Sequence, residues 1–258
     1  MNKIPKDISL FAFDLDGTLY FGESLIEGAI DLISFIQKNY NVVFFTNNST
    51  KTRKEIHSKL IHLGFKCNVN EVFTSSYVAG KYLSEAGIDN VYVIGSEGLR
   101  SEILDNGIRI IDNSIAENLI VGLDLNFSYN KIETAMTVIM KNGKFIVCNE
   151  DKFFPVEKNK FMPACGAMVG SLYAVTNKSP DFIVGKPNTY FLSKIQDSYG
   201  IKHHEIVVVG DSYDSDIMMA INNNSTAVLL NSNNHVTNNS VLVIENPIKM
   251  LQYLIKDE

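Results

Sequence analysis

Two aspartates, Asp14 and Asp16, stand two residues apart at the end of an apolar run, ISLFAF, that covers residues 8–13. Residues two apart on a strand point to the same face, so both carboxylates can face one site, although the chain turns at Gly17. Acidic residues are poor strand formers, and unpaired carboxylates are costly at the end of a buried strand. The spacing therefore predicts a chemical role for this pair.

Polar residues also end three further apolar runs, at 42–46, 182–186 and 206–211. These runs are almost entirely apolar, as expected of parallel strands that are covered on both faces. Their last residues are Thr46, Lys186 and Asp211. Ligands bind outside the carboxyl ends of the strands in open parallel sheets, so we expect these side chains to meet Asp14 at one place.

The carboxylates of Asp14, Asp16 and Asp211 would lie at that place, and Asp216 is close to Asp211 in the sequence. Such a group of carboxylates predicts a metal site. Bare carboxylates ~4 Å apart repel by ~1 kcal/mol at the dielectric constant of water and by ~4 kcal/mol at an effective value of 20. A divalent cation removes this repulsion, and an all-oxygen ligand set suits Mg²⁺. Zinc is disfavoured, because the five histidines form no pair at helical spacing.

Thr46 opens the stretch TNNSTKTR at residues 46–53, which indicates an anion site. Its hydroxyl, the Asn47 amide and successive backbone N–H groups lead into the start of a predicted helix. Lys186, in GKP, would add a compact positive charge. A carboxylate nucleophile, a second carboxylate, a hydroxyl, a lysine and an acidic metal site together imply phosphoryl transfer through an aspartyl-phosphate.

The order of elements predicts an α/β fold with a doubly wound parallel sheet, because helical patterns at 27–38 and 51–63 alternate with the apolar runs. A second α/β set, with strands at 91–95, 118–124 and 144–150 and helices at 97–107 and 129–140, interrupts this pattern. We therefore expect a Rossmann-like core domain of residues 1–86 and 181–258 with an inserted cap domain of residues 87–180. The Asn-rich stretch 222–240 is expected to be a surface loop around a short strand at 226–230.

Composition narrows the class of protein. The net charge of −6 and the lack of a basic stripe disfavour a nucleic-acid partner. No apolar run approaches the ~18 residues of a membrane helix, and the first residues lack the pattern of a secretory signal. Three widely spaced cysteines are expected to fill apolar space rather than form a disulfide framework. The expectation is a cytoplasmic protein without a membrane partner.

The sequence resembles the haloacid dehalogenase superfamily of phosphohydrolases. Four segments in order carry the likeness: DLDGT (14–18), VVFFTNNS (42–49), GKP (185–187) and GDSYDSD (210–216). It is more closely similar to the NagD-like or p-nitrophenyl-phosphatase subfamily through further segments: TNNSTKTR (46–53), GSEGL (95–99), VGLDLNFSYNKIETA (121–135) and GKPNTYF (185–191). The likeness covers nearly the whole chain.

The resemblance implies a role for each matching residue. Asp14 would be the nucleophile and a Mg²⁺ ligand, and Asp16 would be the general acid, then base, and a metal ligand through its backbone carbonyl. Asp211 would complete the protein ligands of the metal. The other implied roles are phosphate binding by Thr46, Asn47 and Lys186, and orientation of neighbouring side chains by Asp216.

The cap departs from the subfamily near the segment that is expected to face the substrate. Glu150 stands where proline is common, and ACGAM at 164–168 replaces a glycine-rich motif. Asn149, Glu150 and Asp151 are therefore candidate substrate-selecting residues, with an ordinary acidic loop as the alternative. The two carboxylates would disfavour strongly anionic leaving groups.

The sequence predicts a Mg²⁺-dependent phosphatase of a small phosphorylated metabolite, of the sugar phosphate, nucleotide, pyridoxal phosphate or phosphoglycolate type. One alternative is a phosphate-binding regulatory protein without turnover, but binding alone needs no second carboxylate at Asp16. A phosphotransferase or mutase would share the first motif, although the inserted cap does not look like the small helical mutase cap. Members of the family often pair through the cap, so a homo-oligomer stays open.

Overall fold

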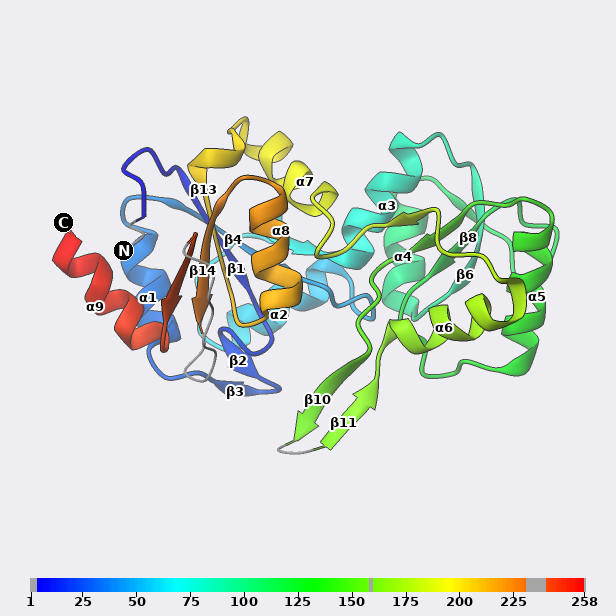
Figure 1. Ribbon diagram of the computed structural model, residues 1–258, viewed down its shortest axis with the longest axis horizontal. Helices are drawn as coiled ribbons and strands as arrows, with labels where there is room; N and C mark the ends of the chain where they lie inside the picture. Colours follow the sequence, from blue (N-terminus) through cyan, green and yellow to red (C-terminus); the bar gives the residue numbers. More distant parts are fainter. Residues whose placement is uncertain (1–3, 158–159, 231–239, 258) are drawn as a thin grey trace. The chain divides into compact units, whose positions relative to one another are not determined.

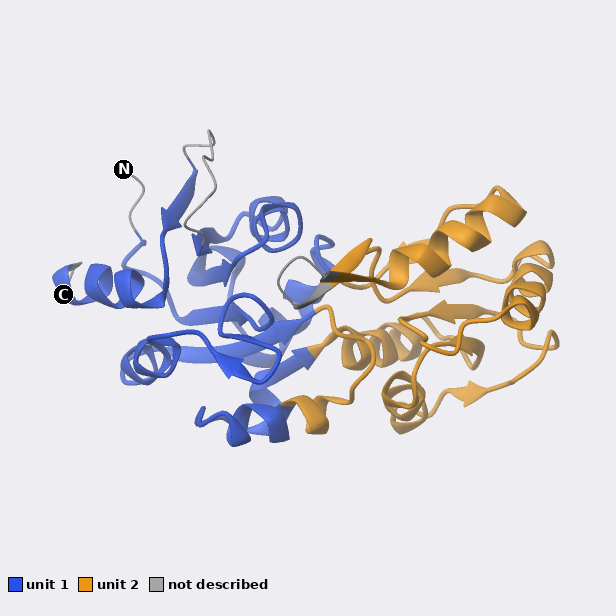
Figure 2. Ribbon diagram, turned by 90° about the horizontal axis from the view of Figure 1, so that it is seen from below, with its two compact units in different colours: residues 1–46, 57–73, 186–258 blue, residues 47–56, 74–185 orange. Residues whose placement is uncertain are grey.

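The computed structural model describes residues 4–157, 160–230 and 240–257 (Figure 1). The described chain divides into two compact units (Figure 2). Unit 1 comprises the described residues of 1–46, 57–73 and 186–258, and unit 2 comprises those of 47–56 and 74–185. Unit 2 begins earlier than the expected cap, because α3 (Ser75–Glu85) packs along α4 (Glu97–Asp105).

Unit 1 is built on a parallel sheet whose strand order among the described residues is β15-β14-β13-β1-β4-β5. Its strands are β1 (Leu10–Asp14), β4 (Asn41–Thr46), β5 (Val72–Thr74, whose last residue falls in unit 2), β13 (Ile206–Gly210), β14 (Thr226–Leu230) and β15 (Val241–Ile244). β1 pairs in parallel with β13 on one side and with β4 on the other. The central strand therefore carries Asp14 between the ends of its two neighbours.

Helices cover this sheet, which explains why β1 and β13 are buried along their whole length. α1 buries an apolar stripe and packs on α9. The helices that belong wholly or partly to unit 1 are α1 (Ala29–Ile36), α2 (Arg53–His62), α7 (Tyr190–Tyr199), α8 (Met218–Asn222) and α9 (Pro247–Asp257). Short elements complete it: β2 (Tyr20–Phe21), β3 (Ser24–Leu25), η1 (Val69–Glu71), η2 (His203–Glu205) and the π-helical turn η3 (Tyr213–Ile217). The predicted doubly wound α/β core is confirmed.

Unit 2 has a parallel sheet of its own, with strand order β12-β9-β8-β6-β7. Its strands are β6 (Asn90–Ile94), β7 (Arg109–Ile110), β8 (Leu119–Val121), β9 (Phe145–Val147) and β12 (Phe182–Ile183). α5 (Tyr129–Met140) and α6 (Cys165–Thr176) pack on each other and share a buried cluster with the sheet. The strands lie between this pair and the pair α3 and α4 (Figure 1). β10 (Phe153–Glu157) and β11 (Lys160–Pro163) form a separate hairpin.

One predicted strand is wrong. Residues 182–186 were expected to form a core strand that ends at Lys186, but only Phe182 and Ile183 are in a strand, and they pair with β9 in unit 2. Phe182 is held there by stacking on Tyr82, with ring centroids 4.0 Å apart. The next two residues also bond to unit 2, because the Val184 and Gly185 N–H groups donate to the Val147 and Cys148 carbonyls. Lys186 is instead the first residue of the chain's return to unit 1.

Two smaller expectations have mixed outcomes. The predicted short strand at 226–230 is β14, whereas residues 231–239 of the Asn-rich segment lie outside the described residues. Among the helices of the described chain, none has both the length and the apolar character that a bilayer crossing requires.

Candidate active site

Lys186 lies between two buried aspartates in unit 1. Its Nζ donates to Asp14 Oδ1 at 2.5 Å and to Asp216 Oδ1 at 2.7 Å. All three side chains are almost fully buried. Asp216 also accepts a hydrogen bond from the Ser212 N–H, which fixes its carboxylate from the other side. The arrangement holds an ammonium group directly against the carboxylate that ends the central strand.

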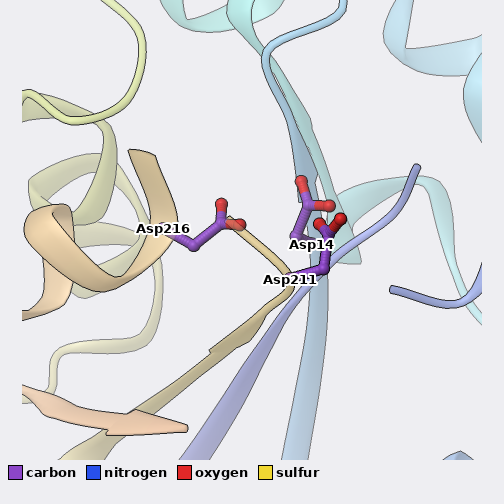
Figure 3. Close-up of side chains that lie close together, drawn as sticks. All are labelled: Asp14, Asp211 and Asp216. Atoms are coloured by element: carbon purple, nitrogen blue, oxygen red, sulfur yellow. The ribbon is translucent and has the colours of Figure 1, made fainter. Parts of the chain in front are cut away.

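A third carboxylate joins this pair. Asp14, Asp211 and Asp216 offer oxygen atoms that all lie within 4.8 Å of one another. Asp14 and Asp211 extend from the ends of neighbouring strands, and Asp216 reaches toward them from η3 (Figure 3). The Thr18 hydroxyl is 3.3 Å from both Asp14 Oδ2 and Asp211 Oδ1. The residues thus form an oxygen-rich cluster at the carboxyl edge of the sheet.

Gly17 makes this cluster sterically feasible. Its φ of +91° is in the region that favours glycine, and a Cβ atom there would lie 2.3 Å from Asp211 Oδ2. Any other residue would be strained by its backbone and would displace the Asp211 carboxylate. The glycine of the DLDGT segment is therefore explained by two independent requirements.

The charges of the cluster do not balance, because three carboxylates face one ammonium group. Burial, reinforced by Asp216, raises the pKa of Asp211 to about 6. Burial also raises the pKa of Asp14, with the Lys186 charge opposing it. Burial alone would lower the pKa of Lys186, but Asp14 and Asp216 outweigh it and raise that pKa, so the lysine stays cationic. A divalent cation with a preference for oxygen ligands would remove the excess negative charge, so the residues fit Mg²⁺.

Asp16 is placed differently from the other carboxylates, because its side chain is accessible to solvent. The protein around it is nevertheless dense enough that desolvation raises its pKa, with the charge of Lys59 opposing this effect. The Tyr20 hydroxyl donates to Asp16 Oδ2 at 3.5 Å, and Lys59 Nζ lies 4.0 Å from the centre of the Tyr20 ring. A raised pKa increases the protonated fraction of a carboxyl group, which is what a proton donor requires.

The remaining predicted residues are divided between the two units. Thr46 is buried at the end of β4, in unit 1 with the aspartates. Asn47 is the first residue of unit 2, where its Nδ2 donates to both Asp151 oxygens, at 3.2 and 3.1 Å. Asn149 is buried and donates to the Asn47 carbonyl, whereas Glu150 is exposed.

Sequence reasoning missed Tyr20 and Lys59, which contact Asp16 or its partner, and Ser75, whose hydroxyl donates to the Asn47 carbonyl at 2.7 Å. Tyr20, the first residue of β2, lies only four residues after Asp16, and this closeness in sequence is a usable signal. Lys59 looks like any lysine on an exposed helix, and Ser75 lies 28 residues from its partner, so nothing local marks either of them.

Comparisons with known proteins identify the family of this chain. A family model described as haloacid dehalogenase-like hydrolase matches residues 11–109, and a second HAD-hydrolase-like model matches residues 183–247. An acid sugar phosphatase of Staphylococcus epidermidis is 36% identical over 84% of this chain and 84% of its own length. The chloroplastic phosphoglycolate phosphatase 1A of Arabidopsis thaliana is 33% identical over 97% of this chain and 75% of its own length.

Solved structures show the same fold. A p-nitrophenyl phosphatase from Archaeoglobus fulgidus superposes with a TM-score of 0.88 at 23% identity, covering 95% of this chain and 99% of its own. A thermostable NPPase double mutant from Geobacillus stearothermophilus gives a TM-score of 0.83 at 28% identity, covering 92% and 96%. The chain therefore belongs to the haloacid dehalogenase-like hydrolases, as a phosphoric monoester hydrolase of the NagD-like and p-nitrophenyl phosphatase group.

Proposed function

We propose that this phosphatase is Mg²⁺-dependent and hydrolyses the phosphate monoester of a small metabolite through a phosphate ester on the Asp14 carboxylate. One observation carries the proposal: the Lys186 ammonium lies between Asp14 and Asp216, within a cluster of three carboxylates at the carboxyl edge of the sheet. A buried lysine beside a strand-end carboxylate would be poorly placed for a purely structural role, because burying these charges is costly.

Asp14, Asp211 and the backbone carbonyl of Asp16 would hold the metal ion. When bound, Mg²⁺ would supply positive charge against the oxygens of the transferring phosphoryl group. Lys186 would supply a second positive charge, and Asp216 would keep the lysine in place. Thr46 and Asn47, which follow each other at the end of β4, would donate hydrogen bonds to the phosphate.

The first chemical step belongs to Asp14 and Asp16. One Asp14 carboxylate oxygen attacks phosphorus, and the bond between phosphorus and the leaving-group oxygen breaks. Asp16 gives its proton to that oxygen, so the leaving group departs as a neutral alcohol. The raised pKa of Asp16 supports this assignment, because it increases the fraction of the acid that carries a proton.

The second step returns the enzyme to its starting state. Asp16, now ionised, takes a proton from a water molecule, whose oxygen attacks phosphorus. The bond between phosphorus and the Asp14 oxygen breaks, which releases inorganic phosphate and regenerates the carboxylate. Because Asp16 is exposed, both the leaving group and the water molecule can reach it.

For the substrate we propose a small phosphorylated metabolite, with sugar phosphates and phosphoglycolate as the first classes to examine. Both classes appear in the names of relatives that match most of this chain. The core residues address only the phosphate group, which all such molecules share, so unit 2 would make the choice among them. Glu150, exposed at the end of the segment after β9, is the candidate for contact with the leaving group.

A direct test measures phosphate release from p-nitrophenyl phosphate, sugar phosphates and phosphoglycolate, with Mg²⁺ and with excess chelator. We expect turnover that needs the metal, and calorimetry should show Mg²⁺ binding that is weakened in Asp211→Asn. Full activity in chelator would contradict the metal requirement. A phosphotransferase would instead pass phosphate to a second hydroxyl compound, and a regulatory protein would bind phosphate without releasing product.

A further inference from the structure

The side chain of Asn47 is held by a carboxylate 104 residues away in the sequence. Asn47 Nδ2 lies 3.2 and 3.1 Å from the two oxygens of Asp151, and both residues belong to unit 2 (Figure 2). An ionised carboxylate can only accept hydrogen bonds, so the NH₂ group of the Asn47 amide must face Asp151. Hydrogen bonds to a charged acceptor are about twice as strong as neutral ones. Asp151 therefore fixes which way this amide points.

The backbone of Asn47 is held by the same segment. Its carbonyl oxygen accepts from Asn149 Nδ2 at 2.8 Å and from the Ser75 hydroxyl at 2.7 Å. Asn149 Oδ1 in turn accepts from the backbone N–H of Asp151 at 3.1 Å, so the Asn149 side chain is joined to the backbone of Asp151. Two donors on one carbonyl fill both of its lone pairs, which fixes the peptide plane between Asn47 and Asn48.

Gly185 closes the other side of the Asn47 side chain. A Cβ atom at Gly185 would lie 2.5 Å from Asn47 Oδ1 and 2.4 Å from the Cys148 carbonyl. The amide thus has Asp151 at its nitrogen and the Gly185 backbone near its oxygen. Gly185 directly precedes Lys186, so the residue that constrains Asn47 also leads into the buried lysine.

From this geometry we infer that Asp151 and Asn149 are positioning residues of the phosphate site, which act through Asn47 and not on the leaving group. The inference rests on the proposed function, because it takes Asn47 to bind phosphate. It also separates Asp151 from its exposed neighbour Glu150, which has the same charge and keeps the task of leaving-group selection.

The two tasks have different kinetic consequences. Every phosphate monoester presents the same phosphate group, so loosening Asn47 should weaken all substrates and inorganic phosphate by a similar factor. A residue that touches the leaving group should change the ranking of substrates and leave the affinity for inorganic phosphate unaltered. The comparison of Asp151 with Glu150 can therefore be made inside one short segment.

The experiment compares Asp151→Asn, Glu150→Gln and a matched control, Asp105→Asn, which makes the same chemical change at an exposed position of unit 2. For each we would measure the inhibition constant of inorganic phosphate and kcat/KM for p-nitrophenyl phosphate, a sugar phosphate, phosphoglycolate and pyridoxal phosphate. Asp151→Asn should weaken phosphate inhibition by roughly 3- to 30-fold and lower all kcat/KM values by a similar factor. Asp105→Asn should match the wild type, and Glu150→Gln should change only the ranking.

A double-mutant cycle with Asn47→Ala tests the route of the effect. If Asp151 acts through Asn47, Asp151→Asn should change phosphate inhibition by less than about twofold once Asn47 is alanine. An undiminished effect in that background, or a changed substrate ranking with unchanged phosphate inhibition, would overturn the inference. A wild-type protein that releases no phosphate from any of the substrates would overturn the proposed function itself.

Discussion

The two parallel sheets of the molecule have similar architecture, but their carboxyl edges carry different chemistry. In unit 1, β1 ends in Asp14, β4 ends in Thr46, and Asp211 follows β13. In unit 2, β6 and β8 are each followed by a glycine, and β9 is followed by Cys148 and Asn149. The strand ends of one sheet carry acidic and hydroxyl side chains, whereas the first residue after each of these strands of the other sheet is glycine or cysteine.

The edge of the unit 2 sheet is occupied by the protein's own chain. Segment 47–51 accepts hydrogen bonds there: Ser96 donates to the Thr50 carbonyl at 2.7 Å, and the Leu123 N–H donates to Ser49 Oγ at 2.9 Å. Glycine makes the close approach feasible, because a Cβ atom at Gly98 would lie 2.4 Å from the Thr50 carbonyl. A strand-end position that would bind a ligand in another sheet here binds the segment that follows Thr46.

The same kind of sheet thus serves two purposes in one chain. In open parallel sheets, loops gather at the carboxyl edges, and the side chains of these loops decide which groups bind there. Carboxylates without enough cations attract a metal ion, whereas hydroxyls and amides satisfy a peptide backbone. We therefore expect substitutions at the unit 1 edge to change catalysis, and substitutions at the unit 2 edge to change how firmly segment 47–51 is held.

Substitution of Asp14 should cause the greatest loss of activity, because it removes the nucleophile and one metal ligand together. Asp14→Asn should lower phosphate release from p-nitrophenyl phosphate by on the order of 10⁴-fold or more, the scale seen when a covalent nucleophile is lost. Asp214 is an exposed aspartate in η3, the same turn as Asp216, so Asp214→Asn is the matched control and should match the wild type. Near-normal turnover by Asp14→Asn would rule out the covalent mechanism.

A smaller loss is expected at Asp16, where only proton transfer is removed. General acid–base groups are worth about 10²–10⁴-fold, so Asp16→Asn should slow steady-state turnover by that factor. Mg²⁺ binding measured by calorimetry should change little, because the proposed contact uses the backbone carbonyl. A loss of less than ~3-fold, well below that range, would assign proton transfer to another residue.

Sequence reasoning found the unit 1 edge because its signals are local. An apolar run that stops at a polar residue marks both a buried strand and its functional end, and this was enough to place Asp14, Thr46 and Asp211 on neighbouring strands. The same signal failed at 182–186. A short apolar run does not say which sheet it joins, and the stacking of Phe182 on Tyr82 decided this in favour of unit 2.

The unit 2 edge could not be predicted in the same way. The pairing of Asn47 with Asp151 joins residues that are 104 apart, and Ser96 lies 46 residues from the Thr50 carbonyl that it contacts. Hydrogen bonds of this kind depend on the packing of whole elements, which leaves no periodic trace in the sequence. The segment 149–151 was selected for its polar composition, but the separate positions of Asp151 and Glu150 come only from the structure.

The charge imbalance at the unit 1 edge predicts a pH-dependent stability of the metal-free protein. The pKa of Asp211 rises from 3.8 to about 6, so the folded state binds this proton more tightly than the unfolded state. This group therefore adds stability at low pH, and that contribution is lost as the pH rises through about 6. Between pH 3.8 and about 6, the free energy of urea unfolding measured in chelator should decline by on the order of 1–3 kcal/mol in total.

Two comparisons isolate that contribution. Asp211→Asn cannot ionise at this position, so its decline over the same pH window should be smaller than that of the wild type. Excess Mg²⁺ should also reduce the decline, because the cation stabilises the ionised carboxylates in the folded state. A metal-free wild type and an Asp211→Asn variant with parallel pH profiles would contradict the proposed charge imbalance.

The smallest expected effect is at the unit 2 edge, where Ser96 precedes α4. A serine at this position usually accepts a hydrogen bond from the helix, but the Ser96 side chain makes no such cap and donates to the Thr50 carbonyl instead. Ser96→Ala should therefore cost about 1–2 kcal/mol of unfolding free energy through the lost bond. The control is Ser171→Ala, because the Ser171 hydroxyl bonds only to the preceding turn of its own helix among the bonds described, and this change should cost much less.

If segment 47–51 matters for phosphate binding, Ser96→Ala should also weaken inhibition by inorganic phosphate by a few-fold, while Ser171→Ala should not. Equal stability losses in the two variants would mean that the unit 2 edge does not hold this segment in the way that the structure indicates.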